Sequence, residues 1–265
     1  MKILLTNDDG IDAPGLAALY HAIRHLGAVT VAAPLQVQSA TSHAVTFHRP
    51  IRTSRRTIAA QELCPGGFCG VAVDGRPADC VKLAMHRVFG DEPDLVVSGM
   101  NKGANVGINT LYSGTVGAAR EAAIYGVPAV AVSLHIGQRE GIRWSDAARH
   151  AADVIADLLA AGPLPAHNVV NINVPCLDGG AEPRGVRVVP MSTSRIIEEY
   201  TATDGDNGDR HYMAADTFDF HTMHPDTDVE ALFAGYISVT PLHFDLTDHS
   251  QLQQLSAQLT TTPTS

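Results

Sequence analysis

Short apolar runs alternate with amphipathic stretches over roughly the first 173 residues of the chain. The apolar runs have the length of buried strands at residues 2–6, 29–33, 94–98, 127–133 and 169–172. Between them, apolar positions recur at helical spacing at residues 15–26, 78–88, 116–125 and 145–161, and Gly126 and Gly162 are placed to end the last two helices. This alternation is typical of βαβ units. It predicts an α/β fold, a Rossmann-like three-layer αβα sandwich around a mostly parallel sheet.

The regular alternation ends after Pro175. Residues 175–224 include the glycine- and aspartate-rich segment 204–209, and we expect hairpins and loops that leave the core there. A strand is predicted to return at 235–240, followed by a terminal helix at 248–258. We therefore expect an α/β core at 1–175. The C-terminal extension at 176–265 is not an independent domain, and its hairpin and helix form an arm suited to contact a neighbouring subunit.

Composition and charge restrict the partners of the chain. Its 265 residues carry a formal net charge of -10, which argues against binding nucleic-acid polymers or anionic membranes. No apolar run is long enough to span a bilayer, and the N-terminus does not read as a signal peptide, so we predict a cytoplasmic protein. The four cysteines lack C-x-x-C spacing, which disfavours a zinc site. We expect reduced thiols, although Cys64 and Cys69 are close enough in sequence to pair.

Two adjacent carboxylates follow the first predicted strand, in the sequence Asn7-Asp8-Asp9-Gly10. Ligands of open α/β sheets bind at the carboxyl ends of the strands. Neighbouring carboxylates that lose hydration there need a cation or several donors to stay ionised, and Mg²⁺ or Mn²⁺ suits oxygen ligands. This dipeptide alone leaves open the alternative that Asp8 and Asp9 only form a turn and cap a helix.

Two further polar loops follow predicted strands. Ser39 lies in the loop after the second strand, where it offers a hydroxyl, although most such serines are ordinary turn residues. The glycine-rich loop after residue 98 contains Asn101 and Asn105, whose amides can bind a metal or a phosphate oxygen but are also common in turns.

The same loop leads to Ser113-Gly114-Thr115 at a predicted helix start. Free amides, hydroxyls and the helix dipole make this tripeptide an anion site, or else an ordinary N-cap. Neither a Walker A loop nor a Gly-x-Gly-x-x-Gly after the first strand is present, which disfavours ATP and dinucleotide cofactors. The coincidence of three such loops at one sheet edge favours a metal and phosphate site.

An ordered set of motifs runs along nearly the whole chain: Asn7-Asp8-Asp9-Gly10, the Ala33-Pro34 loop ending at Gln38-Ser39, Val73-Asp74-Gly75-Arg76-Pro77-Ala78-Asp79-Cys80-Val81, the stretch from Ser98 to Gly107, Tyr112-Ser113-Gly114-Thr115-Val116-Gly117-Ala118-Ala119, and Gly235-Tyr236-Ile237-Ser238-Val239-Thr240-Pro241-Leu242. Together these motifs resemble the SurE family of metal-dependent survival nucleotidases. The resemblance implies hydrolysis of phosphate from nucleoside monophosphates at the 5′ position, with hydrolysis at the 3′ position left open.

The resemblance also implies roles for individual residues. One divalent ion per subunit, Mg²⁺ or Mn²⁺, would be held by Asp8, Asp9, Ser39 and Asn101. The phosphate site would be lined by Asn105, Ser113, Gly114 and Thr115. The family further implies a homodimer or homotetramer built through a swapped C-terminal arm.

The chain departs from the family pattern at two places. Leu35-Gln36 stands where the family commonly has an acidic-basic pair, and Ala40 stands where it commonly has glycine. The segment 204–220 keeps only His211-Tyr212 of the expected aromatic signature. Substrate preference and the packing of the arm are therefore the features most open to change.

The expected chemistry is hydrolysis of a phosphomonoester, with Asp8 or Asp9 orienting or deprotonating the attacking water. Direct attack by a carboxylate is the alternative. Among 13 histidines, His243 is the first choice for the acid that protonates the leaving group, and His43, His48, His211 and His249 are further candidates. Two other functions remain open: a phosphatase for short polyphosphate or sugar phosphates, and a nucleotide sensor without turnover. A purely structural assembly module would leave the three polar loops unexplained.

Overall fold

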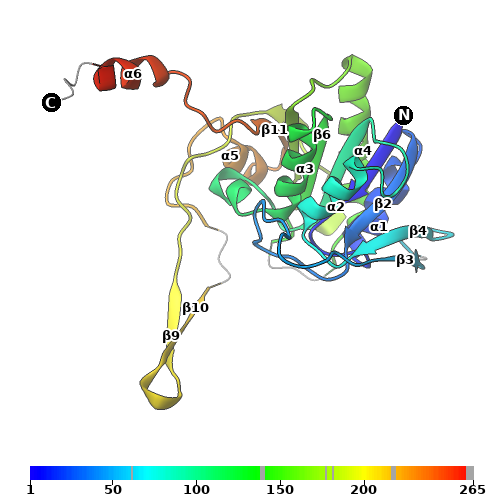
Figure 1. Ribbon diagram of the computed structural model, residues 1–265, viewed down its shortest axis with the longest axis horizontal. Helices are drawn as coiled ribbons and strands as arrows, with labels where there is room; N and C mark the ends of the chain where they lie inside the picture. The colour runs from blue at the N-terminus through cyan, green and yellow to red at the C-terminus, as the bar shows by residue number, and fades with distance from the viewer. Residues whose placement is uncertain (61, 138–140, 177, 181, 216–218, 261–265) are drawn as a thin grey trace.

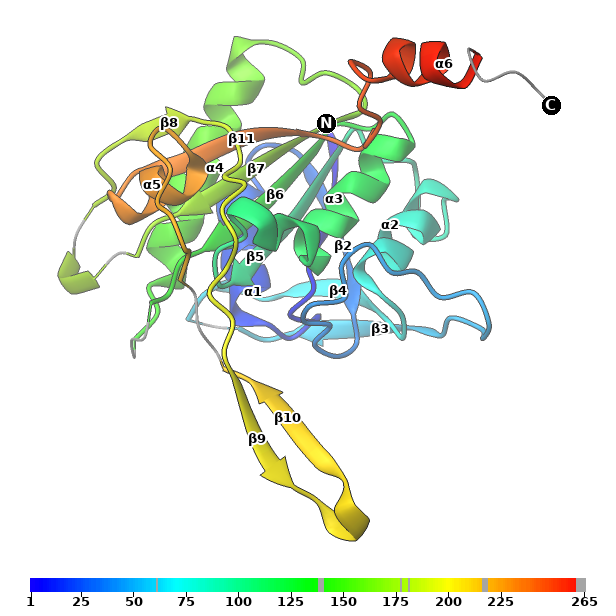
Figure 2. The same cartoon turned by 90° about the vertical axis from the view of Figure 1, so that its left-hand side faces the viewer.

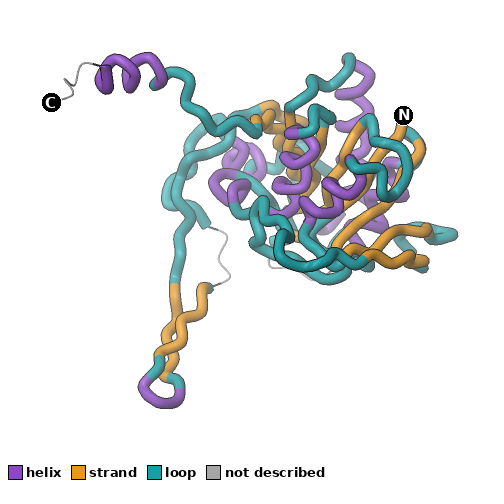
Figure 3. The backbone as a smooth tube through the Cα atoms, in the orientation of Figure 1, coloured by secondary structure: helices purple, strands orange, loops and turns teal. Residues whose placement is uncertain are grey.

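A nine-stranded sheet with helices on both faces forms the body of the molecule, and two segments project from it (Figures 1 and 2). The computed structural model describes residues 1–60, 62–137, 141–176, 178–180, 182–215 and 219–260. Figure 3 shows the orange strands enclosed between purple helices in the body. The layered arrangement confirms the predicted αβα architecture.

The strands and helices follow in the order predicted for the core. The strands are β1 (Lys2–Thr6), β2 (Ala28–Pro34), β3 (Thr53–Ile58), β4 (Phe68–Val73), β5 (Leu95–Lys102), β6 (Ala129–Leu134), β7 (Asn168–Val174), β8 (Val186–Val188), β9 (Tyr200–Asp204), β10 (Arg210–Ala214) and β11 (Ile237–His243). The helices are α1 (Pro14–Ile23), α2 (Pro77–Met85), α3 (Gly114–Ile124), α4 (Trp144–Ala161), α5 (Asp228–Phe233) and α6 (Leu252–Thr260), and a 3-10 turn at Gly107–Leu111 precedes α3.

The sheet has the order β3-β4-β2-β1-β5-β6-β7-β11-β8. The six strands from β4 to β7 in this order are parallel, and their carboxyl ends share one edge. Helices α1 and α4 cover one face with a core that includes Leu5, Leu16 and Ile155, and α2 and α3 cover the other. Burial of apolar surface on both faces explains why these strands read as continuous apolar runs.

All nine core elements predicted from the pattern are present, with boundaries shifted by up to four residues. Gly126 follows α3 with φ +80° and Gly162 follows α4 with φ +143°, conformations that favour glycine and that end the helices as expected. The strand expected at 235–240 is β11, and the terminal helix expected at 248–258 begins later, at Leu252.

Other elements were not predicted. Strand β3 is exposed at five of its six positions and carries Arg55 and Arg56, so its sequence lacks an apolar signal. It is held by antiparallel pairing with β4. The expectation that residues 175–224 leave the core is wrong for β8, which pairs with β11 at the edge of the main sheet. Three residues are too few to give a periodic pattern.

The C-terminal arm has the hairpin that the sequence predicts. Strands β9 and β10 pair with each other alone, and Figures 1 and 2 show this yellow hairpin extending away from the body. Helix α6 also stands clear of the sheet, at the end of the chain (Figure 1). The division into a core at 1–175 and an extension at 176–265 stays a prediction, since β8 and β11 of the extension belong to the central sheet.

All four cysteines carry free thiols, which confirms the expectation of reduced cysteines and excludes a Cys64–Cys69 disulfide in this structure. Within the described ranges, no helix combines the length and the apolar character needed to cross a bilayer.

Candidate active site

Asp8 lies at the carboxyl end of β1, with only 5% of its surface exposed. Its carboxylate accepts two hydrogen bonds from Thr115, at 2.5 Å from the hydroxyl and 3.1 Å from the backbone N–H. Loss of hydration on burial raises the pKa of Asp8 from 3.8 to about 6, the bonds from Thr115 lower it, and the neighbouring charge of Asp9 raises it. Asp8 is therefore a buried carboxylate whose charge is incompletely compensated by the protein.

Asp9 is less buried and faces the end of β5. Its Oδ2 accepts a hydrogen bond of 2.8 Å from the backbone N–H of Lys102. Burial raises the pKa of Asp9 as well, and the bond and charge of Lys102 lower it. Asn101, next in sequence, donates its Nδ2 to the carbonyl oxygen of Gly103 at 2.8 Å, so the amide oxygen is the group it can offer to a cation. The carboxyl ends of β1 and β5 thus bring Asp8, Asp9 and Asn101 to one place.

The loop after β2 is attached to the same site. The backbone N–H of Gln38 donates to the carbonyl oxygen of Asp8 at 2.8 Å, and Ser39 follows directly in an exposed turn. Ala40 has φ +52°, a left-handed conformation that disfavours residues with a Cβ. A glycine would adopt this backbone without that cost, and the turn is formed here with alanine.

A partly buried cluster of His43, Lys82 and Glu121 attaches the second half of this loop to α3. Ser42 bonds to the carbonyl oxygens of Leu111 and Tyr112, and His43 Nε2 lies 2.6 Å from Glu121 Oε2. The other oxygen of Glu121 lies 3.1 Å from Lys82 Nζ. Although burial opposes it, the partners His43 and Lys82 hold the pKa of Glu121 below its usual value. The cluster therefore holds the Ser39 loop in place without contacting Asp8 or Asp9 directly.

The N-terminus of α3 is occupied by Asp8. Ser113 is the N-cap, and its hydroxyl accepts from the N–H of Val116 at 3.1 Å, while both donors of Thr115 bond to Asp8. A Cβ on Gly114 would lie 3.0 Å from Asp8 Oδ2, so glycine permits this close approach. Both interpretations of the tripeptide apply: Ser113 caps the helix, and the helix dipole and Thr115 stabilise an anion, which here is the carboxylate of Asp8.

Asn105 lies in a buried polar network that the sequence analysis did not anticipate. Its Nδ2 donates to Ser133 Oγ at 2.8 Å, and its backbone bonds to the side chains of Asn171 and Asn173. The signal was present in the sequence, since two asparagines interrupt the apolar strand β7, but nothing there identified their partner. The network holds the glycine-rich loop against the ends of β6 and β7.

Asp228 is a second buried residue that the sequence analysis missed. It is fully buried at the start of α5 and accepts bonds of 2.8 Å from the N–H groups of Gly107, Ser192 and Val229. Burial raises its pKa, and the three bonds lower it. Asp228 therefore ties the C-terminal extension to the loop that precedes α3.

The structure does not bring His243 to the site within one subunit. β11 runs antiparallel to β7, and His243 at its end pairs with Asn168 at the start of β7. His243 thus lies at the opposite edge of the sheet from Asp8. His243 was a candidate for the acid because its motif is recognisable in the sequence. The sequence does not show that β11 runs antiparallel to β7, and this direction decides at which end of the sheet His243 lies. Of the other histidines, His43 contacts Glu121 and His249 contacts Asp245, and His211 lies on the exposed hairpin.

The donor set at the sheet edge consists of oxygen atoms. Among the described residues, no group of three or more histidine, cysteine, aspartate or glutamate side chains is arranged to hold a metal. The carboxylates of Asp8 and Asp9 with the amide oxygen of Asn101 form a different set, which suits a hard divalent cation. The raised pKa of Asp8 supports this fit, because a buried carboxylate that lacks a compensating charge is stabilised by a cation.

Comparisons with known proteins agree with the motifs. The sequence model of the family described as survival protein SurE matches residues 3–198. The 5′-nucleotidase SurE of Moorella thermoacetica is 41% identical over 259 residues, covering 98% of this chain and 96% of that protein, and that of Geotalea daltonii is 43% identical, covering 96% and 98%. The crystal structure of the SurE protein from Aquifex aeolicus superposes with a TM-score of 0.81 at 34% identity, covering 98% of this chain and 100% of that one. The chain therefore belongs to the SurE family.

Proposed function

We propose that this protein is a 5′-nucleotidase, a phosphoric monoester hydrolase that releases phosphate from nucleoside monophosphates. The observation that carries the proposal is the buried carboxylate of Asp8, held by Thr115 at the N-terminus of α3 and adjacent to Asp9. Relatives named 5′-nucleotidase SurE that match nearly the whole chain support the same activity.

A divalent ion, Mg²⁺ or Mn²⁺, is part of this proposal. Asp8, Asp9 and Asn101 would hold it, with Ser39 as a fourth ligand from the loop that Gln38 attaches to Asp8. Such an ion neutralises a phosphoryl oxygen and increases the acidity of water. The protein's own contribution is to hold these oxygens in a fixed arrangement at the ends of β1, β2 and β5.

The chain's residues then account for the remaining requirements of phosphoester hydrolysis. Asp8 or Asp9 orients or deprotonates the attacking water. Asn105, Ser113, Gly114 and Thr115 would line the phosphate position, where a phosphate would compete for the donors that Asn105 gives to Ser133 and Thr115 gives to Asp8. His243 has no part in this proposal, because it lies at the other edge of the sheet. The leaving oxygen is therefore protonated by another group or by water.

The decisive experiment measures phosphate release from nucleoside 5′- and 3′-monophosphates, short polyphosphate, a sugar phosphate and an artificial phosphomonoester, with Mg²⁺ or Mn²⁺ and with a chelator. We expect metal-dependent turnover that Asp8→Asn abolishes, with the nucleotides as the best substrates. Equal rates on all phosphomonoesters would favour the broader phosphatase. Binding of nucleotide without turnover, in a folded protein, would instead support the sensor.

The identity of the nucleophile is tested separately. Under single-turnover conditions in ¹⁸O-water, direct attack by water places the label in the first phosphate released. Label in an aspartate side chain would show that the carboxylate attacks phosphorus.

We also propose that the C-terminal arm joins subunits into a homodimer or homotetramer. Tyr200, Tyr212 and Met213 on the β9–β10 hairpin are 61%, 65% and 72% exposed, and Leu259 on α6 is 76% exposed. Apolar side chains in this exposed state are typical of a surface that another chain covers. Light scattering after size exclusion is expected to show an oligomer, and removal of residues 200–214 is expected to reduce its size. A monomeric full-length protein would refute this assembly.

A further inference from the structure

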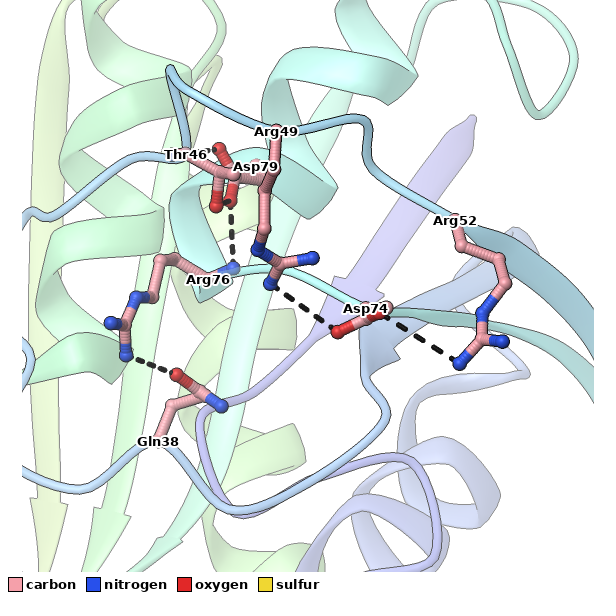
Figure 4. A network of polar contacts seen from close by, with 7 residues as sticks. All are labelled: Gln38, Thr46, Arg49, Arg52, Asp74, Arg76 and Asp79. Carbon is pink, nitrogen blue, oxygen red and sulfur yellow. Dashed lines mark hydrogen bonds and ion pairs between the residues drawn. The ribbon is translucent and has the colours of Figure 1, made fainter.

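A polar cavity lies beside the proposed active site, between the loops that follow β2 and β4. Its volume is about 180 Å³. It is lined by Leu35, Gln36, Gln38, Arg49, Val73, Asp74, Gly75 and Arg76. Figure 4 shows the side chains of Gln38, Arg49, Asp74 and Arg76 arranged around one region in front of the loops.

Figure 4 draws a polar cluster around this cavity, and the guanidinium of Arg76 in this cluster has no anionic partner among the residues drawn. Arg76 Nη1 donates to Gln38 Oε1 at 2.5 Å, and within the described part of the chain no carboxylate lies within ion-pair distance of it. Arg49 and Arg52 both contact Asp74, at 3.3 and 3.8 Å (Figure 4). Arg76 is thus bound by a neutral amide, and its charge is available to an anion from solution.

The remaining carboxylate of the cluster is already satisfied. Asp79 is 1% exposed and accepts bonds from the N–H and hydroxyl of Thr46, at 2.9 and 2.6 Å, and from the N–H of Arg76 at 2.7 Å. Three guanidinium groups therefore face two carboxylates, and the cluster of Figure 4 carries one excess positive charge in a chain whose net charge is -10. This local reversal of sign favours a small anion.

The position of the cavity relative to Asp8 follows from the sheet. β4 and β1 lie on either side of β2, so their ends are separated by two strand spacings, about 10 Å. Gln38 connects the two places, because its backbone N–H bonds to Asp8 while its side chain accepts from Arg76. A ligand that places one phosphate near Asp8 can reach Arg76 with another group on the same molecule.

We propose that this cavity binds a second phosphate of the substrate, and that the protein prefers nucleotides with two separated phosphates, such as nucleoside 3′,5′-bisphosphates. The inference rests on the proposed nucleotidase function. One phosphate is hydrolysed beside Asp8, and Arg76 and Arg49 bind the other, with the Gln38 amide donating to its oxygens once Arg76 turns to the ligand. The second phosphate contributes affinity and is not the group that reacts.

The test compares kcat/KM for a nucleoside 5′-monophosphate, the matching 3′-monophosphate and the 3′,5′-bisphosphate. We expect kcat/KM for the bisphosphate to exceed that for the better monophosphate by about tenfold, mainly through a lower KM. The reason is that only the bisphosphate has a second phosphate that can form a charge-assisted bond with Arg76. Arg76→Ala is expected to reduce this ratio to near one, and Arg76→Lys to restore it in part. Arg56→Ala, which removes the same charge from exposed strand β3 outside the cavity, is expected to leave the ratio unchanged.

The outcomes separate this inference from the proposed function. Turnover of monophosphates with no advantage for the bisphosphate would overturn the second site and leave the nucleotidase intact. Absence of turnover on every substrate would refute the nucleotidase instead. The proposal would also be overturned if Arg76→Ala kept the advantage of the bisphosphate. Inhibition by inorganic phosphate that depends on Arg76, without any advantage for the bisphosphate, would overturn it as well and would indicate a site for free anions.

Discussion

Replacement of Asp8 by asparagine is expected to stabilise the metal-free protein at neutral pH and to have much less effect in acid. Burial raises the pKa of Asp8 from 3.8 to about 6 in the native state. Between these values the native protein holds a proton that the unfolded chain releases, so the stability of the native state falls as pH rises. The two pKa values correspond to a loss of about 3 kcal/mol from this residue, complete above pH 6 and absent below 3.8.

Urea denaturation in the presence of a chelator measures this effect. The free energy of unfolding is determined for wild type and Asp8→Asn between pH 4 and 7.5, at one protein concentration because subunit association would shift it. Asparagine changes the bonds with Thr115, but that offset does not vary with pH. We expect the difference in stability, variant minus wild type, to grow by about 3 kcal/mol from acid to neutral pH.

A divalent ion provides the complementary control. Saturating Mn²⁺ or Mg²⁺ at pH 7.5 is expected to stabilise wild type and to stabilise Asp8→Asn less, because the variant lacks a ligand charge. A stability difference that stays constant across the pH range would refute the conclusion that burial of this carboxylate is costly. It would also remove the main support for a cation beside it.

Three further substitutions test the surroundings of the site. Gly114→Ala places a methyl group 3.0 Å from Asp8 Oδ2, and we expect at least a tenfold loss of kcat with little change in circular dichroism; unchanged kcat would show that the helix start can shift. Glu121→Gln removes the charge that clamps the Ser39 loop, and titration calorimetry should show weaker metal binding with a stability loss of about 1–3 kcal/mol, whereas unaltered metal affinity would limit the clamp to stability. Asp228→Ala leaves three buried N–H groups without their acceptor, so thermal unfolding should show a loss of about 3 kcal/mol or more, and a change below 1 kcal/mol would contradict its role as a tie.

The sequence was sufficient to predict that Asp8, Asp9, Asn101 and Thr115 lie close together. The reason is that parallel strands present their carboxyl ends at one edge, so residues that follow different strands converge without knowledge of the strand order. Buried strands also have a strong local signal, because both of their faces are apolar. These two rules cover the core of the fold and the elements that carry the site.

Features that depend on pairing between distant segments were beyond sequence reasoning. His43 and Glu121 are 78 residues apart, and only the packing of the loop on α3 makes them partners. β3 is a polar strand that exists because β4 offers an edge to pair with. His243 illustrates the opposite error: its motif is recognisable, but an antiparallel return places it at the wrong edge of the sheet.

The arrangement at α3 connects the proposed metal and phosphate positions into one site. Thr115 directs its hydroxyl and its N–H to Asp8, so the donors expected to bind substrate phosphate are already engaged by a carboxylate of the protein. A cation held by Asp8 and its neighbours would compensate that charge, so the carboxylate would depend less on Thr115. The hydroxyl and N–H of Thr115 would then be available to a substrate phosphate. Gly114, whose missing side chain leaves room for Asp8 beside the helix start, would allow the proposed metal and phosphate positions to share these few atoms.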